Sequence, residues 1–215
     1  MSNFLTYSLI SILDFIGIFL FIFPLFRIDV KGYFLRILII STMISYVDYT
    51  LRECMNLDVI APLVHIFMLI ILIWQLLRVQ VTYAIVMAIV GYFTQGLLQV
   101  FLTLSFTTIE NAQEHEYISY SIQVGTAILM FVLGRLIKKM NWGVTFVSDD
   151  EFEKISFSKP NLILFSITFV VLVVGMVGFV IAFKNPIYLH IFLISFFICV
   201  LGILYAIIKK EGSED

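Results

Sequence analysis

The sequence holds 215 residues, of which 61% are hydrophobic and only 13% are charged, and its mean hydropathy is +1.07. A soluble domain carries about 25% charged residues, so this composition excludes a water-exposed globule and predicts an integral protein of the lipid bilayer. The net charge of −2 excludes little, because in a membrane protein the distribution of charge matters more than its total.

Seven stretches are long and apolar enough to cross a bilayer, since a spanning helix needs about 20 predominantly apolar residues. In chain order they cover residues 4–26, 33–55, 59–78, 81–106, 116–138, 161–183 and 187–208. The predicted fold is therefore all-α, a polytopic membrane bundle of seven transmembrane helices. We divide it into a five-helix bundle over 1–140, a cytoplasmic connecting segment over 141–160, and a two-helix hairpin with a short charged tail over 161–215.

Lysine and arginine are concentrated in alternate connections between the predicted helices. One side of the membrane receives eleven of them and the other side receives two, Arg52 and Lys184. The eleven are Arg27, Lys31, Arg36, Arg78, Arg135, Lys138, Lys139, Lys154, Lys159, Lys209 and Lys210. Because basic residues are retained on the cytoplasmic side of a membrane, we predict that the N-terminus lies outside and the C-terminus inside.

The second predicted helix carries two opposite charges within an apolar run. Ser41, Ser45, Asp48 and Arg52 fall at i, i+4, i+7 and i+11, which is one face of a helix. Asp48 precedes Arg52 by four residues, the favourable orientation for an ion pair within a helix. Asp48 also lies about 18 Å beyond Arg36 at 1.5 Å per residue, so we expect the pair in the outer leaflet.

Other predicted helices also carry polar residues in their middle or outer half. Asp14 is the clearest case, because it lies near the middle of the first helix, on one face with Tyr7 and Ser11. An ionisable side chain at the bilayer centre costs at least about 2.5–3.5 kcal/mol, so it faces the bundle interior or a hydrated cavity. We predict an outward-facing polar cavity. Its candidate ligand-binding residues are Asp14, Asp48, Arg52, His65, Gln95, Gln99 and Gln123.

Each of these residues also has a purely structural interpretation. The three glutamines would serve as hydrogen-bond donors and acceptors between helices, and Asp14 as a protonated structural acid. The Asp48–Arg52 pair would pin the outer end of its helix, and His65 would be an ordinary core histidine. The residue pattern by itself favours neither interpretation decisively.

Motifs of known catalytic chemistry are missing from the sequence. It contains no HExxH, no GxSxG and no phosphate-binding glycine loop, and we predict no catalytic residues, no cofactor, no metal and no nucleic-acid partner. Cys54 has no histidine at helical spacing, but a predicted helix–helix turn would allow His65 to approach it. An intramembrane enzyme that uses Cys54 or Asp14 with His65 therefore stays open as an alternative.

Two stretches carry a resemblance to known proteins: SYVDYTLRE (Ser45–Glu53) and YISYSIQVGTAILMFVLGRLIKKMNWGVTFVS (Tyr117–Ser148). Over the first five helices the chain resembles the multi-helix membrane sensor regions that precede the kinase domain in peptide-sensing histidine kinases of Gram-positive bacteria. It is also similar to uncharacterised membrane proteins of the same bacteria. The resemblance implies a location in the bacterial plasma membrane and a sensor-like role in signalling. It supplies no catalytic residues, and no kinase segment follows the helices in this sequence.

We therefore expect a non-enzymatic, receptor-like or accessory subunit that binds a ligand or partner in the outward-facing cavity. It would pass a change to a membrane or cytoplasmic protein partner. The main alternative is a small-solute transporter, or the membrane substrate-binding subunit of one. That alternative requires the polar lining to continue to the inner face, and the sequence shows little sign of such a lining.

Overall fold

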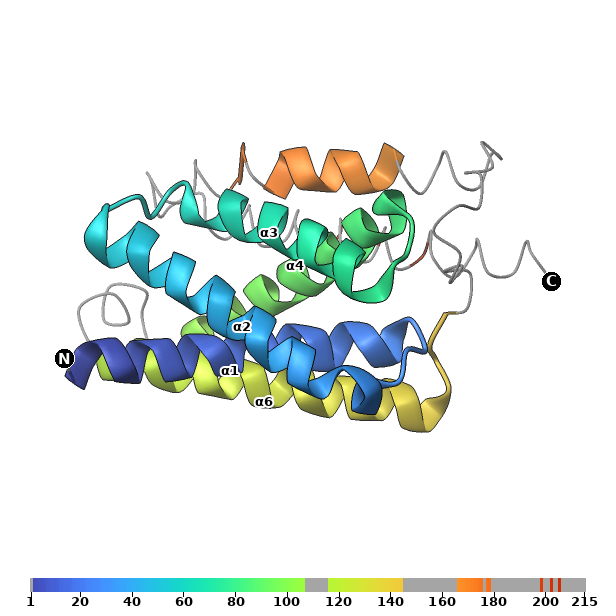
Figure 1. The fold of residues 1–215 in the computed structure, drawn as a ribbon, viewed down its shortest axis with the longest axis horizontal. Coiled ribbons are helices and arrows are strands. Elements are labelled where there is room, and N and C mark those ends of the chain that lie inside the picture. Colours follow the sequence, from blue (N-terminus) through green and yellow to red (C-terminus); the bar gives the residue numbers. More distant parts are fainter. Residues whose placement is uncertain are drawn as a thin grey trace. The chain divides into compact units, whose positions relative to one another are not determined.

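The computed structural model of this chain describes residues 2–106, 116–144, 166–175, 177–178, 198, 202 and 205 (Figure 1). Within these residues the chain is all-helical, which confirms the predicted fold class at this level. Four described helices are long and apolar enough to cross a membrane: Phe4–Leu25, Val30–Cys54, Val81–Phe106 and Tyr117–Met140. They coincide with four of the predicted spans to within a few residues.

The labelled elements are α-helices, one 3-10 helix and one π-helical turn. In chain order they are α1 (Ser2–Leu25), the 3-10 helix η1 (Val30–Tyr33), α2 (Phe34–Tyr49), the π-helical turn η2 (Thr50–Cys54), α3 (Ala61–Leu77), α4 (Val81–Phe106) and α6 (Glu116–Met140). A further described helix covers Ser166–Gly175. The predicted span 59–78 corresponds to α3, which is shorter than expected. Most of 141–160 and of the predicted span 187–208, and part of the predicted span 161–183, lie outside the described residues.

Four segments end at a residue with a left-handed backbone. These residues are Arg27, Asn56, Arg78 and Asn141, with φ between 53° and 54°. The reversal lets later amide groups donate to the last helical carbonyls, as Ile28 N does to Phe23 O at 2.8 Å and Trp142 N to Ile137 O at 3.1 Å. These closures give the last helical carbonyls a donor, and carbonyls without one are costly in an apolar environment.

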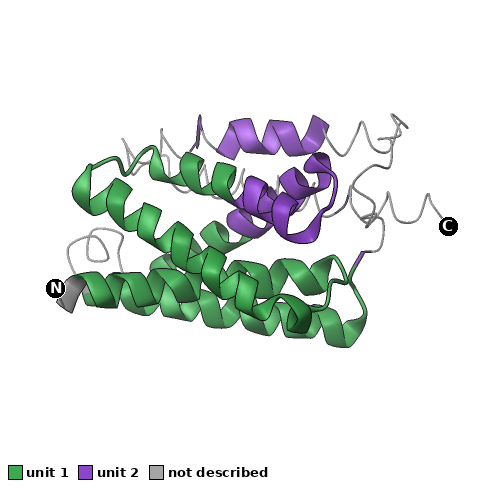
Figure 2. Ribbon diagram, in the orientation of Figure 1, with its two compact units in different colours: residues 1–68, 94–143 green, residues 69–93, 144–215 purple. Residues whose placement is uncertain are grey.

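The chain divides into two compact units (Figure 2). Unit 1 comprises Met1–Met68 and Thr94–Gly143, and unit 2 comprises Leu69–Phe93 and Val144–Asp215. In the described part of unit 2 the buried side chains are mainly apolar, including Ile73, Met87 and Val90. All of the candidate residues predicted from the sequence lie in unit 1.

Within unit 1, α1 lies along α6 and also packs against α2 (Figure 1). Small residues set the close approach of α1 and α6. An added Cβ at Gly17 would lie 3.2 Å from Ala127 Cα, and one at Gly134 would overlap the Leu20 carbonyl oxygen. Contacts advance in the same sequence direction on both helices, so the two helices are parallel. Close backbone approach through glycine is a common way to pack helices in a membrane.

The core of unit 1 differs in character between its two halves. In the half that contains the C-terminal end of α1, the buried side chains are large and apolar, among them Ile18, Phe19, Ile22 and Phe23. In the half that contains the N-terminal end of α1, buried polar side chains accumulate. The buried polar residues of unit 1 are Ser11, Ser41, Ser45, Asp48, His65, Gln95 and Thr126. The candidate site belongs to this polar half.

Candidate functional site

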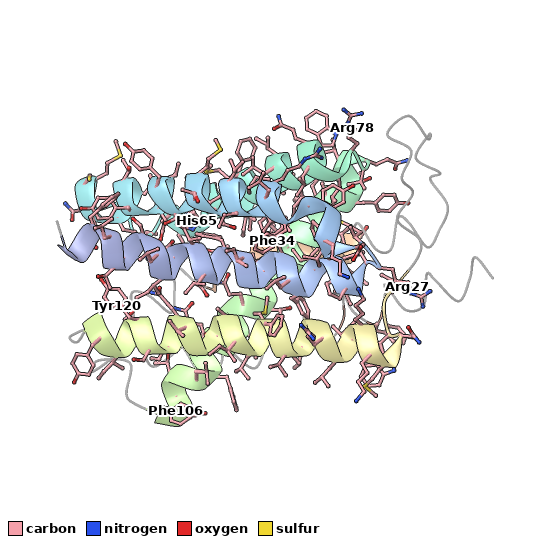
Figure 3. All side chains as sticks on the ribbon, turned by 60° about the horizontal axis from the view of Figure 1, so that its bottom comes forward. Arg27, Phe34, His65, Arg78, Phe106 and Tyr120 are labelled. Carbon is pink, nitrogen blue, oxygen red and sulfur yellow. The ribbon has the colours of Figure 1, made fainter. Side chains whose placement is uncertain are left out.

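The Asp48 carboxylate of α2 contacts side chains from α1, from α3 and from the π-helical turn η2. Figure 3 labels the α3 member, His65. Asp48 Oδ1 lies 2.7 Å from Arg52 Nε and 3.1 Å from His65 Nε2. Asp48 Oδ2 accepts hydrogen bonds from Tyr7 Oη at 2.7 Å and from Ser11 Oγ at 3.3 Å. We call these five residues the Asp48 cluster. A carboxylate has about four acceptor positions, and three of these contacts are hydrogen bonds to Asp48.

Helical geometry explains how each element supplies its part of the cluster. Tyr7 and Ser11 are four residues apart and therefore share one face of α1. That face meets the end of α2, where a second cross-link forms because Ser45 Oγ donates to the Ser8 carbonyl oxygen at 3.0 Å. His65 comes from the second turn of α3. The cluster therefore ties α1, α2 and α3 together at one end of unit 1.

Aromatic rings enclose the cluster. Tyr49 meets Phe4 and Tyr7 edge to face, with ring centroids 4.7 Å and 5.5 Å apart. Phe15 meets the His65 imidazole in the same way at 5.4 Å. Asp48 is only 8% exposed and His65 only 2%. Electrostatic interactions strengthen where water is excluded, so these rings make the Asp48 contacts stronger than surface contacts of equal length.

The π-helical turn η2 places Arg52 at the edge of the cluster. Met55 N donates to the Thr50 carbonyl oxygen at 3.1 Å, a separation of five residues that marks the wider turn. Arg52 Nη1 lies 3.8 Å from Asp58 Oδ1, and the two side chains are 36% and 50% exposed. Arg52 thus connects a buried carboxylate to a half-exposed one. π-helical turns within helices occur frequently at functional sites.

A second polar group lies deeper along α1. The Gln95 side chain of α4 approaches the Asp14 carboxyl group as a hydrogen-bonding neighbour. Asp14 Oδ1 is nevertheless buried and has no hydrogen-bond partner within the described residues, and the same holds for the hydroxyls of Ser8, Ser41 and Thr94. Buried polar atoms are normally satisfied by protein or water. This group therefore has capacity for water or for polar atoms of a ligand.

The predicted site residues separate into three sets in the structure. Asp48, Arg52 and His65 come together, and Asp14 and Gln95 form the deeper group. Gln99 and Gln123 are half-buried, and among the described residues neither side chain is recorded in a hydrogen bond with either group. Their helical spacing places them on a face, and a shared face does not bring side chains from different helices together.

Sequence reasoning did not connect Tyr7 and Ser11 with Asp48. The sequence pattern predicts an ion pair of Asp48 with Arg52, whereas the carboxylate also contacts both hydroxyls and the imidazole. The available signal was the face that Tyr7 and Ser11 share on the first helix. That signal indicates a buried polar face and leaves its partner unspecified.

The described residues include the side chains of the enzymatic alternative, Cys54, Asp14 and His65. They contain no group of three or more His, Cys, Asp or Glu side chains arranged to hold a metal ion. Cys54 is an exposed free thiol. The Nε2 atom of His65 lies 3.1 Å from Asp48 Oδ1, a contact that orients the imidazole.

Comparison of the chain with protein-family models, with curated proteins and with solved structures gives no match. The fold and the site define the class of protein directly: an all-helical protein with four described helices of membrane-spanning length and a buried polar cluster at one end of a helical unit.

Proposed function

We propose that this protein is a non-enzymatic, receptor-like or accessory subunit of the bacterial plasma membrane that binds a ligand or a protein partner from the outer side. In this proposal seven helices cross the membrane with the N-terminus outside, as the distribution of Lys and Arg predicts. The resemblance to the membrane sensor regions of peptide-sensing histidine kinases supports a role in signalling through a partner protein.

The observation that carries the proposal is the one-sided polar core of unit 1. Under the predicted orientation the Asp48 cluster lies in the outer half of the bundle. The inner half of α1 contributes four fully buried apolar side chains, Ile18, Phe19, Ile22 and Phe23. A transport path needs polar lining through both halves, whereas a binding site needs it only where the ligand enters. The geometry therefore supports binding better than transport.

Arg52 is the part of the cluster that a ligand can reach from outside. Its 3.8 Å contact with the half-exposed Asp58 is long, and exposed ion pairs contribute only about 0–1 kcal/mol. A ligand with a carboxylate or another anionic group would replace Asp58 at little cost. Arg52 Nε would remain 2.7 Å from Asp48, so binding would be transmitted to the carboxylate that holds α1 and α3.

Aromatic packing offers a route from this site to the opposite end of the unit. Along α1, Phe19 and Phe23 pack edge to face with ring centroids 6.0 Å apart, and Phe23 packs on Tyr33 of η1 at 5.8 Å. A change in the tilt of α1 at Asp48 would therefore reach η1 and the start of α2. This part of the chain would face a cytoplasmic partner under the predicted orientation.

The proposal can be tested by site-specific photocrosslinking in intact cells. A photoreactive amino acid at Glu53, which is exposed on η2, should form a discrete adduct with the natural ligand or partner. The same group at Ile39, which is 53% exposed on α2, serves as the lipid-facing control and should not form it. Adding Arg52→Gln should remove the Glu53 adduct. Equal adducts at both positions, or an adduct indifferent to Arg52→Gln, would overturn the proposal.

A further inference from the structure

An apolar groove of about 210 Å³ runs between α1 and α6. Leu13, Gly17 and Leu20 line it from α1, and Val124, Ala127 and Phe131 are among the residues that line it from α6. Gly17 and Ala127 are the two small lining residues; their backbones approach closely, so they form the floor of the groove and the larger side chains form its walls. An engineered apolar cavity of about 150 Å³ holds a benzene molecule, so this groove has room for a segment of hydrocarbon chain.

A cationic side chain lies at one end of the groove. The Arg135 guanidinium lies over the Phe131 ring at 4.9 Å from its centroid, and Phe131 is a lining residue. Lys139 follows Arg135 by four residues and so occupies the same face of α6. The groove therefore leads from an apolar interior toward two positive charges on a single helical face.

The surroundings of this end are strongly basic. Residues 27–36 and 135–141 contain six Lys and Arg residues and one acid, Asp29. Asp29 lies 3.7 Å from Lys138, and Arg27 donates to the Asn141 carbonyl oxygen at 3.3 Å, which holds the ends of α1 and α6 together (Figure 3, Arg27 labelled). Arg135 and Lys139 form no ion pair within the described part of the chain.

The depth of Arg135 below the membrane interface indicates which anion these two charges would bind. Trp142 is 66% exposed just beyond the end of α6, where tryptophan typically marks the membrane interface. Arg135 precedes it by seven residues, or about 10 Å of helix at 1.5 Å per residue. A guanidinium at that depth is unfavourable in lipid unless it reaches the interface or meets an anion. A lipid phosphate is the anion available at this level.

We propose that the groove between α1 and α6 is a binding site for an anionic phospholipid. One acyl chain lies against Gly17 and Ala127, and the phosphate contacts Arg135 and Lys139. Basic pockets between membrane helices bind anionic headgroups, with each Lys or Arg contributing roughly a fivefold gain in affinity. The site is separate from the Asp48 cluster, so it stands or falls independently of the proposed function.

The test uses the full chain in nanodiscs that contain equal parts of phosphatidylglycerol and phosphatidylcholine, analysed by native mass spectrometry. The wild type should retain phosphatidylglycerol, and Arg135→Gln should lower that retention about fivefold. Arg36→Gln removes a charge from the same end away from the groove and should have little effect. Val124→Phe should fill the groove and release the lipid, while Val132→Phe, outside the groove and 42% exposed in the wild type, should not.

Three results would overturn the proposal. The first is equal retention of the two lipids by the wild type. The second is an equal loss in Arg135→Gln and Arg36→Gln, which would show a diffuse attraction by net charge. The third is a wild-type mass of two chains that Val124→Phe reduces to one, which would assign the groove to a second copy. The melting temperatures of all four variants identify any that misfold. Two measurements test the site without any substitution: the lipid preference of the wild type, and the decline of that preference with added salt.

Discussion

Replacing Asp48 by asparagine is the most informative perturbation of the candidate site. Asparagine preserves the size of the side chain and one acceptor oxygen, but it removes the negative charge and introduces an amide NH2 group. That group must face either Tyr7 and Ser11, which both donate to Asp48 in the wild type, or Arg52, which donates to it, and His65, which lies 3.1 Å from it. At least one donor therefore loses its acceptor in any orientation of the new amide.

The structure sets the size of the expected loss. A hydrogen bond to a charged group contributes about 1.5–3 kcal/mol, and breaking one side of a buried ion pair costs about 3–5 kcal/mol. The Arg52 side chain is 36% exposed, so solvent screens part of the second effect. We therefore expect a loss of about 3 kcal/mol for Asp48→Asn. For a chain of this length that corresponds to a melting temperature lower by about 6–12 °C.

Asp58→Asn is the matched control, because it makes the same chemical change opposite the same arginine. Its contact with Arg52 is 3.8 Å long and half exposed, so its loss should stay below about 1 kcal/mol. Melting of both variants in detergent, followed by circular dichroism, gives the comparison. Similar shifts for the two variants would refute the reasoning that burial and its several polar contacts make Asp48 the structural centre.

A double-mutant cycle with Arg52→Gln separates the ion pair from the rest of the cluster. The double variant should lose less than the sum of the single variants, by about 0.5–3 kcal/mol. It should not recover fully, because Tyr7, Ser11 and His65 still lack the carboxylate. Full recovery would show that Asp48 and Arg52 act as an isolated pair.

Three further predictions follow from other parts of the chain. Gly134→Ala should destabilise the chain by about 1–3 kcal/mol, because the added Cβ has no space between α1 and α6. Gly96→Ala should not, because a Cβ there would have nothing within 4 Å. Equal melting temperatures of the two variants would contradict the close packing. Asp14→Asn should leave the melting temperature nearly unchanged, since asparagine keeps hydrogen bonding, yet lower crosslinking to the ligand; full crosslinking would remove Asp14 from the site. With the native cysteines replaced, Leu57→Cys should react with an impermeant maleimide on intact cells and Lys31→Cys only after lysis; the reverse pattern would invert the predicted orientation.

The membrane class and the limits of α1, α2, α4 and α6 could be predicted from the sequence. A run of about 20 apolar residues is a local property, and the helical pattern that follows depends mainly on hydrogen bonds inside the same segment. The pairing of Asp48 with Arg52 was predictable for the same reason, because residues four apart on one helix meet without help from the rest of the fold.

Only the tertiary structure decided which helices share a buried face. The pattern Tyr7, Ser11 and Asp14 marks a polar face of α1, but the register of α1 against α2 brings the first two to Asp48 and leaves Asp14 beside Gln95. Gln99 and Gln123 have equally good helical spacing and join neither group. Helical periodicity specifies the direction in which a side chain leaves its own helix. The partner of that side chain depends on the rotation and shift of the neighbouring helix. Close contacts between helices, such as Gly134 with Leu20, determine that rotation and shift.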